Sequence, residues 1–85
     1  MSMGIVYSNG ALTTADGEVN FGHHTYEVNI ISKNTNHWIE VKLNGGPRSV
    51  WIPPKDTHNY TTIRGDYTKV QVMTAASTVA IFALG

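Results

Sequence analysis

Apolar residues recur at every second position in several short segments of this chain. In residues 38–43 (WIEVKL), Ile39, Val41 and Leu43 alternate with other side chains, and residues 68–73 (TKVQVM) repeat the scheme. Side chains two positions apart lie on the same face of a β-strand, and alternation of this kind is typical of half-buried antiparallel strands. No window places apolar residues at the spacing of a helix face. The pattern therefore predicts strands.

The composition favours the same class. Seven Ile and eight Val stand against three Leu, and ten Thr join them; β-branched residues favour strands. Turn signals such as Asn9-Gly10, Ala15-Asp16-Gly17 and Arg64-Gly65-Asp66 recur at intervals of roughly ten residues. We expect an all-β fold, a compact antiparallel β-sandwich of seven or eight short strands, with a small five-stranded barrel as the alternative.

The chain is expected to form a single β-domain over residues 1–85. Residues 1–22 form either core strands or an N-terminal hairpin arm. The expected strands lie near residues 4–8, 10–14, 18–21, 24–32, 37–43, 48–52, 58–63, 67–73 and 78–84.

Charge and cysteine content exclude several functions. Six Lys and Arg balance six Asp and Glu, and the chain has no Cys. Zero net charge disfavours nucleic acid and anionic membrane surfaces as partners, because both attract basic proteins. Without Cys there is no disulfide, Cys-based zinc site or thiol nucleophile. No apolar run approaches the roughly 20 residues of a membrane helix, and the first residues do not resemble a signal peptide.

No catalytic or metal-binding arrangement stands out in the sequence. The carboxylates are scattered, with no paired arrangement that indicates acid and base roles; they are Asp16, Glu18, Glu27, Glu40, Asp56 and Asp66. The histidines lack the His-x-x-x-His spacing of a zinc site; they are His23, His24, His37 and His58. We therefore expect a non-enzymatic protein without catalytic residues, metal or cofactor. A ring of one His from each copy around a symmetry axis stays open.

Aromatic and other large apolar residues remain once the aliphatic core is assigned. The expected core comprises Ile39, Val41, Leu43, Val50, Ile52, Val70, Val72, Val79 and Ile81. The predicted interface residues are Trp38, Trp51, Met73, Phe82, Tyr60 and Tyr67. Trp is enriched at binding hot spots, and an exposed apolar patch usually marks an interaction site. The alternative is that one or both tryptophans fill the core.

Two kinds of partner fit this expected surface. The first is another copy of the chain or a larger scaffold, because an interface would add to the limited burial available to 85 residues. The second is a sugar, stacked on exposed Trp and Tyr as in small carbohydrate-binding modules. Stacking on nucleic-acid bases is less favoured, since Lys and Arg are not interleaved with the aromatic residues.

Residues 63–72 and 74–85 comprise a valine-rich segment, a short Ala/Ser/Thr turn and a final apolar segment that ends at glycine. This last third of the chain resembles the closing hairpin of small β-sandwich virion proteins of tailed phages. The Trp51-Ile52-Pro53-Pro54 segment fits the same pattern. The resemblance covers residues 51–85 and implies a capsid decoration (cement) protein or accessory virion subunit. It further implies a homo-oligomer, most often a trimer, that binds the major capsid or another virion protein and is made in the host cytoplasm.

Overall fold

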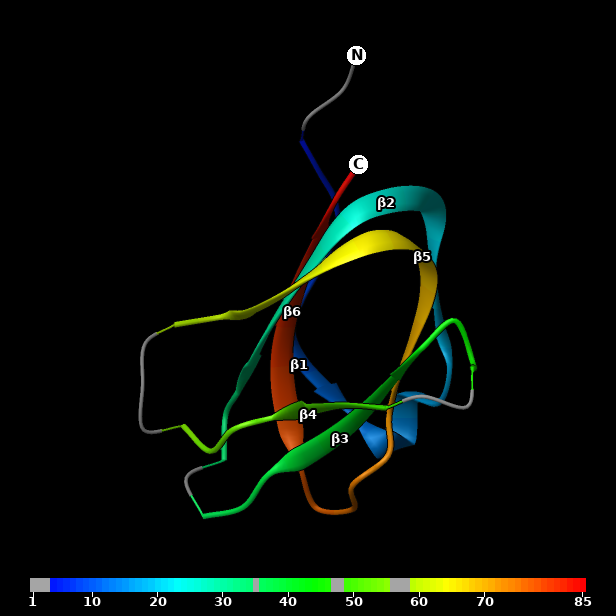
Figure 1. Ribbon diagram of the computed structural model, residues 1–85. Helices are drawn as coiled ribbons and strands as arrows, with labels where there is room; N and C mark the ends of the chain where they lie inside the picture. The colour runs from blue at the N-terminus through cyan, green and yellow to red at the C-terminus, as the bar shows by residue number, and fades with distance from the viewer. Residues whose placement is uncertain (1–3, 35, 47–48, 56–58) are drawn as a thin grey trace.

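The computed structural model describes residues 4–34, 36–46, 49–55 and 59–85, which form one antiparallel sheet (Figure 1). The sheet order is β1-β6-β2-β5-β3-β4. The elements are β1 (Ile5–Thr13), the 3-10 helix η1 (Thr14–Asp16), β2 (Val19–Ser32), β3 (Ile39–Leu43), β4 (Ser49–Ile52), β5 (Thr61–Val72) and β6 (Thr78–Leu84). The expected all-β antiparallel class is confirmed.

The described residues form six strands, fewer than the seven or eight expected, because three pairs of expected strands are continuous. Asn9-Gly10 and Arg64-Gly65-Asp66 lie inside β1 and β5 instead of forming turns. Both long central strands contain a glycine with positive φ, Gly22 at 78° and Gly65 at 150°. The register of β2 against β5 shifts between Asn20 and Thr25 and again before Glu27. Bulges of this kind bend a strand without ending it.

The described residues 4–22 contribute to the sheet and to the core. β1 pairs with β6 and not with the start of β2. Leu12 and Phe21 are both buried in the common core, and the Tyr7 ring lies 5.1 Å from that of Phe21. β1 and the first part of β2 therefore contribute to the domain core.

The expected turn at Ala15-Asp16-Gly17 is confirmed, and a second turn follows β3. Ala15-Asp16-Gly17 falls at η1, where Thr13 and Asp16 form a capping box and Gly17 has a φ of 64°. Asn44 and Gly45 follow β3 with φ angles of 60° and 62°. These angles lie in the left-handed region that Asn and Gly tolerate best.

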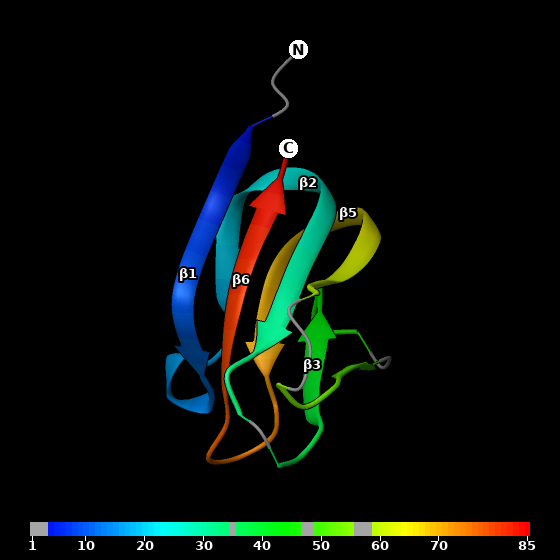
Figure 2. The same ribbon diagram turned by 90° about the vertical axis from the view of Figure 1, so that its left-hand side faces the viewer.

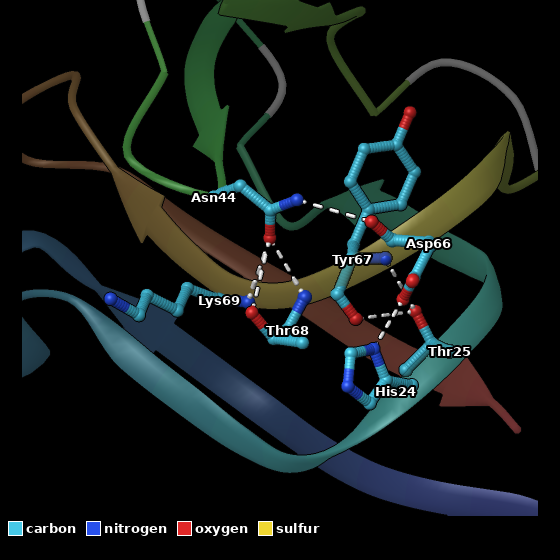
Figure 3. Close-up of polar contacts among 7 residues, drawn as sticks. All are labelled: His24, Thr25, Asn44, Asp66, Tyr67, Thr68 and Lys69. Carbon is cyan, nitrogen blue, oxygen red and sulfur yellow. Dashed lines mark hydrogen bonds and ion pairs between the residues drawn. The ribbon is translucent and has the colours of Figure 1, made fainter.

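Asn44 also joins β3 to β5 through its side chain (Figure 3). Its Oδ1 accepts from the backbone N–H of Thr68 at 2.7 Å and of Lys69 at 3.3 Å, and its Nδ2 donates to the Asp66 carbonyl at 3.1 Å. The side chain thus extends the backbone ladder beyond the last residue of β3. Near the bulge, the Thr25 hydroxyl donates to the Tyr67 carbonyl at 2.8 Å.

Eight of the nine expected core residues are buried, and Val50 is half-buried against them. The chain exposes 4916 Å², and a folded monomer of 9.3 kDa typically exposes roughly 5,000 Å². Its burial is therefore that of an ordinary monomer of this size. One sequence argument for self-association was that 85 residues bury too little surface alone, and the exposed area does not support it. The other argument, the exposed apolar side chains, is unaffected.

The bent strands β2 and β5 fold the single sheet into two layers (Figures 1 and 2). Figure 2 shows β1, β6 and part of β2 side by side in one layer, while β3 and β4 belong to the other. Side chains from both layers contribute to one core cluster. Since the inner faces meet at this core, the outer faces point in opposite directions.

Candidate interaction surfaces

The outer face of β3 and its neighbours carries both tryptophans of the chain. By register, Trp51 on β4 lies directly across from Glu40 on β3. On the other side of β3, the Met73 N–H donates to the Glu40 carbonyl. Trp38 directly precedes β3 and is two residues from Glu40, so it shares that face. We call this set the tryptophan surface: Trp38, Glu40, Lys42, Ser49, Trp51, Gln71 and Met73.

The large side chains of the tryptophan surface are open to solvent. Trp38 and Trp51 are each 54% exposed, and Met73 is 37% exposed. The aliphatic neighbours Ile39 and Ile52 are buried. The alternative that the tryptophans fill the core is therefore wrong, and the face predicted from period-two alternation is confirmed.

A second apolar surface lies on the outer face of the other layer. Phe82 on β6 pairs with Asn29 on β2, and Ile31 pairs with Ala80. The ring of Tyr60, which precedes β5, meets the Phe82 ring edge-on with centroids 5.0 Å apart. Tyr60 is 43% exposed and Phe82 is half-buried. We call this set the Tyr60–Phe82 surface: Asn29, Ile31, Tyr60, Thr62, Ala80, Phe82 and Leu84.

Polar groups of the Tyr60–Phe82 surface bond to one another. Asn29 is buried although it belongs to the outer face, because the two rings meet across its strand. Its Nδ2 donates to Glu27 at 3.0 Å, and its Oδ1 accepts from the Thr62 hydroxyl at 2.7 Å. Glu27 also pairs with Arg64, at 3.5 Å. A partner could cover this surface without leaving these groups unbonded.

The predicted interface residues do not form a single surface. Phe82 and Tyr60 lie on one layer, whereas Trp38, Trp51 and Met73 lie on the other. In the sheet order, β2 and β5 separate β6 from β3. Tyr67 belongs to neither surface, because it is half-buried against the core at the bend of β5. The sequence could not resolve this division, because the pairing of distant strands decides it.

Alternation also misplaced one aromatic residue and passed over several polar ones. Alternation with period two would place Tyr26 on the same face as Val28 and Ile30, yet Tyr26 is 40% exposed while both aliphatic residues are buried. The register shift between Thr25 and Glu27 explains the difference, since one extra residue reverses the facing of a strand. Gln71 was not among the predicted interface residues. Its position between two buried valines is nevertheless a sequence signal that places it on the tryptophan surface.

Two of the described histidines contact polar side chains. His24 Nδ1 lies 2.8 Å from Asp66 Oδ1 in a strongly exposed pair (Figure 3). His37 contacts Ser77 Oγ at 2.7 Å. In the part of the chain that the structure describes, no group of three or more His, Cys, Asp or Glu could hold a metal, and no pocket opens. Asp56 and His58 lie outside the described residues.

Within residues 4–34, 36–46, 49–55 and 59–85, no helix is long and apolar enough to span a membrane. Comparisons with protein-family models, curated proteins and solved structures find no match for this chain.

Proposed function

We propose that this protein is a non-enzymatic structural subunit that self-associates and stabilises a larger assembly. The observation that carries the proposal is the presence of two exposed aromatic surfaces on opposite sides of a fold with an ordinary monomer core. A subunit with two such surfaces can contact a copy of itself through one and another molecule through the other. Its phage-like C-terminal third favours a capsid decoration (cement) or accessory virion protein, with a homotrimer as the expected form.

The Tyr60–Phe82 surface is the better candidate for contact between copies. Its large residues are apolar, and Asn29, Thr62 and Glu27 already satisfy one another. Burying such a surface removes apolar area from water while Asn29 and Thr62 keep their hydrogen bonds. Ile5, which is 62% exposed and pairs with Leu84, extends the apolar area toward the β1 edge of the sheet.

Charge placed on this surface should separate the copies. Tyr60→Lys is expected to convert the oligomer to a monomer at micromolar concentration, because an unpaired ammonium is costly to bury. Sedimentation velocity measures the change, and an unchanged thermal melt would show that the fold is retained.

Trp51→Lys is the matched control, because Trp51 is similarly exposed but lies on the opposite layer. It is expected to keep the oligomer intact. If Trp51→Lys separates the copies and Tyr60→Lys does not, self-association uses the tryptophan surface and the assignment above is wrong.

A second candidate function is carbohydrate binding through exposed aromatic residues. The polar groups of the tryptophan surface favour it.

A further inference from the structure

The tryptophan surface combines flat apolar groups with polar groups in a regular grid. One row across the strands is Trp51, Glu40 and Met73, and the next is Ser49, Lys42 and Gln71. Trp38 lies at the end of β3 nearer Glu40. Because diagonal neighbours on a sheet face are about 7–8 Å apart, one extended ligand can contact both indoles and the polar groups between them.

Among the described residues, no other aromatic ring pairs closely with either indole. The close ring pairs in this part of the chain are Tyr7 with Phe21 and Tyr60 with Phe82. The indoles of Trp38 and Trp51 therefore offer broad apolar faces, and each also carries one N–H donor.

Three polar side chains between or beside the indoles retain free hydrogen-bonding capacity. One oxygen of Glu40 accepts from the Ser49 hydroxyl, and the other has no partner among the described residues. Within the same part of the chain, Lys42 and Gln71 make no side-chain hydrogen bond, although both are half-buried. The surface therefore offers free donors and free acceptors close together.

The charges on this surface cancel. Glu40 carries one negative charge and Lys42 carries one positive charge, and the other five residues of the set are uncharged. Binding to the phosphate backbone of a nucleic acid requires an excess of Lys and Arg, and a strongly acidic ligand would meet Glu40. The preferred ligand is therefore electrically neutral.

We infer that the tryptophan surface binds a neutral carbohydrate chain. A pyranose ring has C–H faces that stack on indoles and a rim of hydroxyl groups that both donate and accept hydrogen bonds. Its hydroxyl groups can form hydrogen bonds with Glu40, Lys42 and Gln71, and its C–H faces can stack on the indoles of Trp38 and Trp51. This inference does not depend on self-association, since the Tyr60–Phe82 surface lies on the other layer.

Tryptophan fluorescence tests the inference directly, because both tryptophans of the chain lie on this surface. The protein is titrated with hexasaccharides of β-1,4-linked glucose, mannose, xylose and N-acetylglucosamine. We expect a saturable change in emission with at least one of them. Isothermal calorimetry with the same sugar should show affinity about tenfold lower for Trp51→Ala and for Trp38→Ala, as expected for the loss of one stacking contact.

Tyr60→Lys is the control here, because it removes an exposed aromatic residue from the opposite layer. It should bind the sugar as the unaltered chain does, even where it abolishes self-association. The absence of a saturable response to all four sugars would overturn the inference. So would tighter binding of an oligothymidylate than of any sugar, or equal sugar affinity in Trp51→Ala.

Discussion

Replacing Ile39 with Ala is expected to lower the free energy of unfolding by about 3 kcal/mol, within the range of 2–5 kcal/mol for buried Ile→Ala changes. Ile39 is fully buried in the common core. A domain of this size typically has only about 4–13 kcal/mol of stability, so the variant should lose a large fraction of it. Urea unfolding followed by circular dichroism measures the change.

Trp38→Ala is the matched comparison, because Trp38 is the adjacent residue and lies on the opposite face of the same strand. Its removal should cost less than about 1 kcal/mol, since its side chain is 54% exposed. A loss for Trp38→Ala as large as that for Ile39→Ala would mean that the tryptophan belongs to the core. It would also remove the basis for a tryptophan binding surface.

Gly65→Ala is expected to destabilise the protein by about 2 kcal/mol. Gly65 has a φ of 150°, a conformation that only glycine adopts readily. A Cβ at this position would also lie 3.0 Å from the ring of Tyr67, which packs against the core. The melting temperature and the urea midpoint should both fall.

Gly10→Ala provides the control for Gly65→Ala. Gly10 lies in β1, where an added Cβ meets no atom within 4 Å and φ is not positive. Its replacement should leave stability unchanged or raise it by up to about 1 kcal/mol, because the unfolded chain loses conformational freedom. If Gly65→Ala proved equally harmless, β5 would not be bent at Gly65 in the manner described.

The difference between these glycines shows what the sequence could predict. Alternation placed Ile39, Val41 and Leu43 in the core because each strand repeats locally with period two. Gly65 looked like a turn because glycine between two charged residues is a common turn signal. Whether such a glycine ends a strand or bends it depends on the partner strand, here β2, whose register shift between Thr25 and Glu27 lies opposite Gly65.

The candidate surfaces, like the strands, could be predicted from the sequence only in part. The exposed face of Trp38 and Glu40 follows from the buried Ile39 between them. The separation of Phe82 from Trp51 does not, because it requires the sheet order, which places β2 and β5 between their strands. The hydrogen bond that the Thr62 hydroxyl donates to Asn29 leaves no pattern in the sequence either, since the two residues are more than thirty positions apart.

The mass of the unaltered protein in solution tests the central claim most directly. Light scattering at micromolar concentration should give a closed oligomer, with a trimer at about 28 kDa, three times the 9.3 kDa chain. The chain folds with an ordinary monomer core, so a stable monomer is a real alternative. A mass of 9.3 kDa that persists as the concentration is raised would contradict the proposal that this protein is a self-associating structural subunit.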